Sequence, residues 1–167
     1  MPTVIRNIDL LADLLLVRRL PPFHANTGKR LVKSPKTYVR DSGIVHALLG
    51  IEDFDALAGH PVAGPSFEGF AIENLLAACP PRTTAGFYRT AAGAEIDLVL
   101  DLPGRKGRWA VEIKRGLSAA PSRGLHNALE DLKPKRAFIV YGGEERYPMG
   151  ESIEAIGLSA MAELLRA

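Results

Sequence analysis

The sequence predicts a mixed α/β (α+β) domain of ordinary size, 167 residues long. Three short apolar stretches, 86–90, 95–101 and 108–115, follow one another with glycine-containing turns between them, as consecutive β-strands do. Amphipathic helices are expected before these strands, over 66–78, and after them, over 121–133. The core is therefore expected to have the order α-β-β-β-α-β, with a fourth strand completing a mixed four-stranded sheet.

The fourth strand is expected over 136–141, because four apolar residues stand in a row at 137–140. A last strand is expected over 152–156 and a final helix over 158–166. These elements complete a core that we place at residues 65–167.

An amphipathic helix is expected near the start of the chain, over residues 5–19. Apolar side chains recur there every three or four positions, as in Ile8, Leu11 and Leu15. Two consecutive prolines at 21–22 would end the helix, because proline cannot continue the hydrogen-bond ladder.

The remaining part of the first 64 residues is expected to be irregular, with two short elements. The pattern favours a short strand over 37–40 and a helix over 42–49, followed by a connection over 52–64 that is first acidic and then rich in glycine and proline. We expect residues 1–64 to form an N-terminal helical and strand accessory segment.

Bulk composition excludes several classes of protein. No apolar run approaches the length of about 20 residues that a membrane-spanning helix needs. Cys79 is the single cysteine, so no internal disulfide can form. The start of the chain lacks the pattern of a signal peptide, and we expect a cytoplasmic protein.

A basic segment lies between residues 18 and 40, where seven lysines and arginines occur without any aspartate or glutamate. Such a segment can neutralise the phosphates of DNA, although a solvated basic surface has the same composition. The net charge of +2 does not decide between these alternatives. The expected nucleic-acid contacts are Lys29, Arg30, Lys33, Lys36 and Arg40.

Charged side chains interrupt the two apolar strands at 95–101 and 108–115. Alternation places Glu112 and Lys114 on one face of their strand, and it places Asp97 on the same face as Val99. In a hairpin, Asp97, Glu112 and Lys114 can converge into a site for a divalent metal and a phosphate. The alternative is a charged patch in which Lys114 bridges the two carboxylates.

The helix over 66–78 contains two glutamates that its geometry separates. Glu68 lies within the apolar arc of the helix and therefore needs a partner, whereas Glu73 projects from the opposite side and is expected to face water. Glu68 is expected either to join the site of Asp97 and Glu112 or to form a buried pair with Arg89.

A glutamate on a helix, an aspartate on a strand and Glu-x-Lys on the next strand resemble the PD-(D/E)XK nuclease superfamily. Nearly the whole chain also resembles the DUF4143 domain, which is found at the C-terminus of many prokaryotic AAA+ family ATPases. The stretches that carry this second resemblance are 26–30, 33–38, 41–43, 48–50, 67–68, 88–90, 93–97 and 112–114.

The first resemblance implies a restriction-endonuclease-like fold and a nuclease site. Asp97 and Glu112, with the carbonyl of Ile113, would bind Mg²⁺ or Mn²⁺, and Lys114 would orient a water molecule or the phosphate. Glu68 would complete the site. The implied activity is metal-dependent cleavage of DNA.

Non-catalytic functions remain as alternatives. One is a module that binds DNA or protein and is associated with an AAA+ ATPase; another is a protein-interaction appendage with Leu11, Leu15 and Leu16 exposed on the first helix. The chain has no G-x-x-x-x-G-K-[ST] loop, so it cannot hydrolyse ATP by that route.

Overall fold

The computed structural model describes residues 2–24, 28–150 and 152–167. Residues 26–27, which belong to the stretch 26–30 noted above, lie outside the described part. The described residues form a mixed α/β structure with six helices and a six-stranded mixed sheet. No helix among them is both long and apolar enough to cross a membrane.

The main sheet has the strand order β3-β4-β5-β6-β8-β7. Strands β3, β4 and β5 pair antiparallel, β5, β6 and β8 pair parallel, and β7 pairs antiparallel with β8. The strands are β3 (Thr84–Arg89), β4 (Glu95–Leu102), β5 (Gly107–Lys114), β6 (Arg136–Tyr141), β7 (Tyr147–Pro148) and β8 (Ile153–Gly157).

The expected four-stranded sheet is too small. The stretch predicted as a last strand, β8, joins the sheet in parallel beside β6, and β7 adds a sixth strand at the edge. Strand β7 has only two residues, one of them a proline, which is too short for any periodicity to be visible in the sequence.

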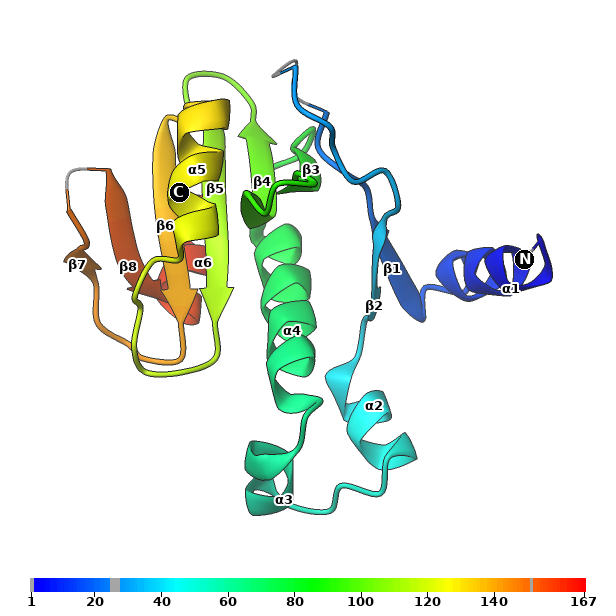
Figure 1. Ribbon diagram of the computed structural model, residues 1–167. Coiled ribbons are helices and arrows are strands. Elements are labelled where there is room, and N and C mark those ends of the chain that lie inside the picture. Colours follow the sequence, from blue (N-terminus) through cyan, green and yellow to red (C-terminus); the bar gives the residue numbers. More distant parts are fainter. Residues whose placement is uncertain (1, 25–27, 151) are drawn as a thin grey trace.

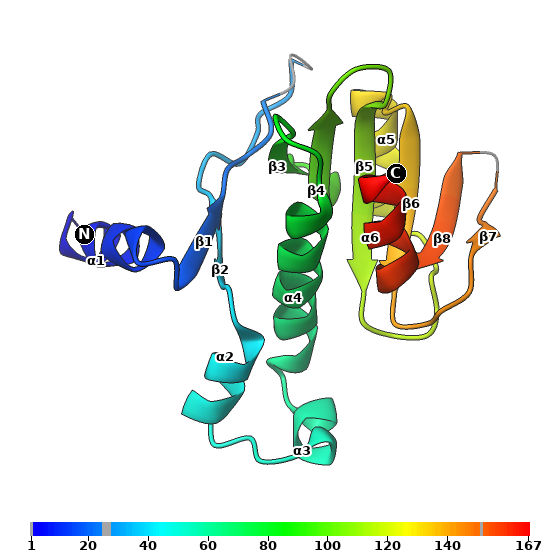
Figure 2. The same ribbon diagram turned by 180° about the vertical axis from the view of Figure 1, so that it is seen from behind.

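Helices cover both faces of the sheet (Figures 1 and 2). Helix α5 (Arg123–Leu132) covers one face, and its Leu125 packs there with Val99 and Ile139. Helices α4 (Ala63–Ala78) and α6 (Leu158–Arg166) pack on each other and cover the opposite face. The order α4-β3-β4-β5-α5-β6 matches the α-β-β-β-α-β order predicted from the sequence.

The N-terminal helix is shorter than the sequence predicts. Helix α1 (Pro2–Asp13) ends before a turn in which Leu15 has a φ of 61°, and Val17–Leu20 then forms strand β1 instead of a further helical turn. Strand β1 pairs antiparallel with β2 (Lys36–Val39). Leu20 on β1 is buried in the core, and this tertiary burial outweighs the local helical periodicity.

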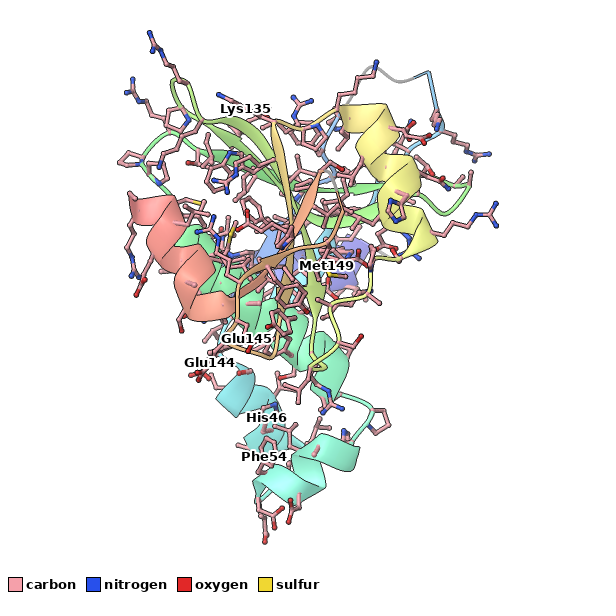
Figure 3. All side chains as sticks on the ribbon, turned by 90° about the vertical axis from the view of Figure 1, so that its left-hand side faces the viewer. His46, Phe54, Lys135, Glu144, Glu145 and Met149 are labelled. Atoms are coloured by element: carbon pink, nitrogen blue, oxygen red, sulfur yellow. The ribbon has the colours of Figure 1, made fainter. Side chains whose placement is uncertain are left out.

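The expected connection over 52–64 also contains a helix. After α2 (Ser42–Leu48), helix α3 (Phe54–Gly59) begins where the Asp53 carboxylate accepts the N–H of Ala56. Phe54 is highly exposed and lies at the end of the molecule opposite Lys135 (Figure 3).

Between β1 and β2, residues 21–24 and 28–35 include contacts along the free edge of β3. Phe23 donates its N–H to the carbonyl of Phe87, and Val32 donates its N–H to the carbonyl of Arg89. Gly86 permits the close approach, because a Cβ atom there would lie 2.8 Å from the carbonyl oxygen of Pro21. The N-terminal segment therefore protects an edge strand that would otherwise present unpaired backbone groups.

Candidate functional site

The predicted site residues lie where strands β4 and β5 separate. The ladder between these strands extends from Leu102 back to Leu98, which pairs with Val111. Asp97 is the next residue, and its Oδ2 accepts the N–H of Ile113 at 3.0 Å. At the end of the ladder, the carboxylate of Asp97 thus takes the place of a backbone carbonyl as the acceptor for an N–H of β5.

A β-bulge turns Asp97 away from the face that simple alternation predicts. Two steps along β3, from Gly86 to Tyr88, oppose three steps along β4, from Val99 to Ile96. As a result, Ile96 packs under α5 together with Val99, whereas Leu98 packs under α4. The expectation that Asp97 shares a face with Val99 is wrong, because the extra residue lets Asp97 reach the α4 side.

Three carboxylates meet at the ammonium of Lys36. Its Nζ lies 3.0 Å from Oε1 of Glu68, 3.1 Å from Oε1 of Glu95 and 3.1 Å from Oδ1 of Asp97. The Tyr38 hydroxyl donates to Glu68 Oε1 at 2.5 Å. We call these five residues the Lys36 cluster.

Three elements supply the Lys36 cluster. Lys36 and Tyr38 are two positions apart on β2, so their side chains share a face of that strand. Glu68 comes from α4, whereas Glu95 and Asp97 come from the start of β4. The cluster therefore depends on the N-terminal segment as well as on the core.

Burial and the neighbouring charges shift the pKa values of Lys36, Tyr38 and Asp97. Burial alone would lower the pKa of Lys36, but Asp97 and Glu68 outweigh it and raise this pKa above its ordinary value. Burial, and then the hydrogen bond to Glu68, raise the pKa of Tyr38. The pKa of Asp97 is also raised, by burial and by the negative charge of Glu68, although Lys36 opposes the shift.

Glu112 and Lys114 form a separate pair. The Lys114 Nζ lies 2.5 Å from Glu112 Oε1, and the Glu112 side chain is only 8% exposed. Its Oε2 is buried and has no hydrogen-bond partner among the described residues. A buried carboxylate oxygen without a donor is costly, so this atom indicates a place for a cation or another donor.

Only the peptide of Ile113 connects the two groups. It follows Glu112 in the chain, and its N–H binds Asp97. Within the described residues, no side-chain hydrogen bond or ion pair joins Glu112 or Lys114 to the Lys36 cluster. The sequence predicts one site for Asp97, Glu112 and Lys114, whereas in the structure Asp97 binds Lys36 and Lys114 binds Glu112.

The donor atoms suit a hard divalent cation. No three His, Cys, Asp or Glu side chains in the described ranges are placed to hold a metal together. Mg²⁺, however, is commonly bound through one or two carboxylates and several waters. Asp97 and Glu112 are the two carboxylates at the Ile113 peptide: Asp97 accepts its N–H, and Glu112 precedes Ile113 in the chain.

One of the two alternatives for Glu68 and the expectation for Glu73 are wrong. Arg89 pairs with Glu95, with Nε 3.4 Å from Oε2, and not with Glu68. Glu73 does not face water: its side chain is 13% exposed and binds both Arg18 and Arg40. Although burial alone would raise the pKa of Glu73, the two arginines lower it overall.

The basic segment does not form a uniform positive surface. Lys29 pairs with Asp131 at 2.5 Å, Lys36 lies in its cluster, and Arg40 binds Glu73. Arg30 and Lys33 are exposed, and among the described residues no ion pair includes either of them. These two side chains are the predicted DNA contacts whose charge faces solvent without a carboxylate partner.

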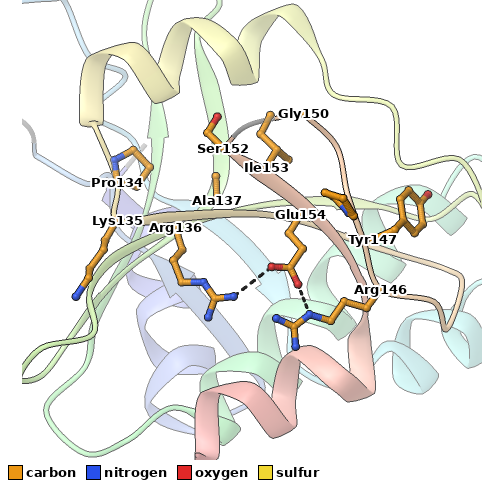
Figure 4. A pocket seen from close by; sticks show the side chains of 11 residues that line it. Pro134, Lys135, Arg136, Ala137, Arg146, Tyr147, Gly150, Ser152, Ile153 and Glu154 are labelled. Atoms are coloured by element: carbon orange, nitrogen blue, oxygen red, sulfur yellow. Dashed lines mark hydrogen bonds and ion pairs between the residues drawn. The ribbon is translucent and has the colours of Figure 1, made fainter.

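A further pocket lies at the other end of the central strands (Figure 4). Glu154 lies between Arg136 and Arg146 and binds both of them, with Arg136 Nη2 3.2 Å from Glu154 Oε2. None of the residues that line this pocket belongs to the Lys36 cluster. The charged lining residues are Arg136, Arg146 and Lys135 against Glu154, so the pocket has a net formal charge of +2 (three positive charges and one negative charge).

Two family models match the chain. Residues 63–161 match the family described as "Domain of unknown function (DUF4143)", and residues 1–55 match "Domain of unknown function (DUF8612)". No solved structure gives a significant match.

Two mycobacterial proteins are similar to most of the chain. Uncharacterized proteins of Mycobacterium tuberculosis and Mycobacterium bovis are each 44% identical to it over 154 residues, which are 92% of this chain and 34% of theirs. The chain thus spans about a third of the length of these relatives. Since the DUF4143 match covers more than half of its residues, the chain belongs to the DUF4143 family.

Proposed function

We propose that this domain is a nuclease of the PD-(D/E)XK type, with a restriction-endonuclease-like core, that cleaves phosphodiester bonds of DNA with a divalent cation. The observation that carries this proposal is the buried, partnerless Oε2 of Glu112 beside the Ile113 peptide that binds Asp97. A cation held by Asp97 and Glu112 would satisfy that oxygen. The α-β-β-β-α-β order supports the proposal at the level of the fold.

The residues of the chain would divide the work as follows. Asp97, Glu112 and the carbonyl of Ile113 would hold Mg²⁺ or Mn²⁺. The ion would supply an activated water and neutralise charge on the scissile phosphate. The Lys114 side chain is one-third exposed, so a phosphate could reach its ammonium. Glu68, which lies in the Lys36 cluster together with Asp97, would complete the site.

Cleavage of DNA by the purified chain tests the proposal. We expect Mg²⁺- or Mn²⁺-dependent cleavage of single-stranded or duplex DNA that Asp97→Asn and Glu112→Gln each reduce by roughly 100-fold or more. Asp101→Asn is the matched control, because Asp101 lies on the same strand but pairs with Arg108 outside the site. Cleavage that persists in Glu112→Gln, or no cleavage with either metal, would contradict the proposal.

A second candidate function is a non-catalytic module that binds a protein partner through α1. Large apolar side chains on α1 and in the turn after it are exposed, including Leu11, Leu15 and Leu16 as the interaction hypothesis requires. The proposed partner is an AAA+ ATPase module. The greater length of the two relatives is compatible with such a further module.

A direct binding measurement distinguishes the second candidate from the first. An ATPase module supplied as a separate chain should bind the wild type, and Leu11→Glu with Leu15→Glu should abolish binding. Leu117→Glu is the control, since Leu117 is 79% exposed and lies far along the chain from α1. Equal binding by both variants would remove α1 as the docking surface.

A further inference from the structure

Lys36 occupies the oxygen of Asp97 that a metal would need. Asp97 Oδ1 lies 3.1 Å from Lys36 Nζ, while Asp97 Oδ2 already accepts the N–H of Ile113. Both oxygens of this carboxylate are therefore engaged. The Lys36 ammonium opposes metal ligation through Oδ1, because Mg²⁺ binds its oxygens at about 2.0–2.1 Å and repels a cation that contacts the same oxygen.

The surroundings of the ammonium hold it in place. Glu68 and Glu95 bind the same Nζ from two further directions, and the ammonium lies 5.6 Å from the centre of the Phe87 ring. The Lys36 side chain is only 19% exposed. Lys36 is thus a built-in counter-ion for three carboxylates rather than a surface lysine that happens to be near them.

The strand that carries Lys36 does not belong to the main sheet. Strand β2 pairs only with β1, in a two-stranded sheet, and Lys36 pairs there with Leu20. Figures 1 and 2 show β1 and β2 beside α4, away from the central strands. The position of Lys36 is therefore set by the β1–β2 sheet and not by the ladder between β4 and β5.

We propose that Lys36 is an autoinhibitory residue: its ammonium competes with the divalent cation for Asp97, and the β1–β2 sheet holds it in the inhibiting position. This inference rests on the proposed metal site of Asp97 and Glu112. It assigns Lys36 to the control of that site instead of to contact with DNA. Glu112, whose Oε2 has no hydrogen-bond partner among the described residues, would remain available as a ligand while Lys36 contacts Asp97.

Binding of Mn²⁺ to the full chain, measured by titration calorimetry without DNA, tests the competition. Lys36→Met should raise the affinity for Mn²⁺ by roughly tenfold or more, because the competing charge is gone. Lys36→Arg keeps a cation and should retain the low affinity of the wild type. Lys29→Met is the matched control, since it removes another paired lysine of the same segment, one that binds Asp131.

Thermal unfolding supplies a second readout. In chelator, Lys36→Met should melt below the wild type, because three carboxylates lose their counter-ion, and Mn²⁺ should restore its melting temperature. An unchanged or weaker Mn²⁺ affinity overturns the proposal. A variant that fails to fold both with and without Mn²⁺ also overturns it, since Lys36 would then be a structural residue only.

These results separate the inference from the proposed function. If Lys36→Met binds Mn²⁺ more tightly but neither it nor the wild type cleaves DNA, the competition between Lys36 and the cation is supported and the proposed nuclease function is wrong. If the wild type cleaves DNA while Lys36→Met binds Mn²⁺ no more tightly than the wild type, the nuclease function is supported and the competition is wrong.

Discussion

Asp97 is the residue at which stability and chemistry conflict. Its carboxylate is 16% exposed and lies beside Glu68, so its charge is held in an unfavourable place despite the contact with Lys36. A raised pKa in the folded protein means that folding opposes ionisation of Asp97. The stability associated with its protonated form is therefore lost as the pH rises from the ordinary value of 3.8 through the raised pKa.

Neutralising Asp97 should therefore stabilise the protein. We expect Asp97→Asn to melt a few degrees above the wild type at neutral pH, and the difference should shrink as the pH falls towards 4. The measurement is thermal unfolding followed by circular dichroism across this pH range. A variant less stable than the wild type at neutral pH would show that the contact with Lys36 outweighs the cost of burying the charge.

Glu73 presents the opposite case. Its pKa is lowered, so its charge adds stability above its ordinary value of 4.5, and this stability is lost as the pH falls through the lowered pKa. We expect Glu73→Gln to reduce the free energy of unfolding at neutral pH by about 1–3 kcal/mol, since Arg18 and Arg40 lose their shared partner. Urea unfolding measures this, with Glu163→Gln on α6 as an exposed control.

At the scale of elements, the contact between the N-terminal segment and β3 depends on one glycine. A Cβ at Gly86 would lie 2.8 Å from the Pro21 carbonyl oxygen and 3.1 Å from the Phe23 nitrogen. Both are backbone atoms, so the whole segment has to move to relieve the overlap.

Gly86→Ala should consequently destabilise the protein, by about 1–3 kcal/mol. Gly64→Ala makes an instructive comparison, because Gly64 lies in α4 with open space around its Cβ position. There, alanine should be neutral or slightly stabilising, as helix propensity favours it. Equal effects at the two positions, measured by urea unfolding, would mean that the segment does not pack on β3 as described.

The sequence predicted elements well where a local pattern and the tertiary structure agree. The bounds of β6 and α6 match the predicted 136–141 and 158–166, because an uninterrupted apolar run and a clear helical period leave no competing choice. The helix over 5–19 failed at its end, where burial of Leu20 in the core decides the conformation.

Membership of the site was harder to predict than the elements. Asp97, Glu112 and Lys114 are close in sequence and on paired strands, so spacing alone placed them together. Lys36 contacts Glu68 and Asp97 from 32 and 61 positions away, and no local pattern reports such contacts. Lys36 and Tyr38, two positions apart on one strand, were the available signal, and the charge of Lys36 suggested contact with DNA instead.

At the scale of the whole molecule, the segment before α4 is part of the folded unit that contains the Lys36 cluster. It protects the edge of β3 and supplies Lys36 and Tyr38, whereas α1 contacts little besides β1. Removing the entire segment and removing α1 alone should therefore have different consequences.

Two truncations test this difference. A chain of residues 14–167 should fold with nearly the melting temperature of the full chain, since only α1 is lost. A chain of residues 63–167 exposes the β3 edge and leaves Glu68, Glu95 and Asp97 without Lys36, so it should aggregate or lose much of its stability. Light scattering after size-exclusion chromatography shows whether each truncated chain is monomeric, and thermal unfolding gives its melting temperature. A monomeric, stable chain of residues 63–167 would contradict the prediction that the segment is needed for folding.

The net charge of the Lys36 cluster also affects how a phosphate group can approach it. Three carboxylates and one ammonium leave a formal charge of −2 (three negative charges and one positive charge) at the start of β4. A DNA backbone meets electrostatic repulsion there until a divalent cation arrives. If the domain acts on DNA with a divalent cation as proposed, the two should therefore bind with positive cooperativity, each increasing the affinity of the other by the same factor.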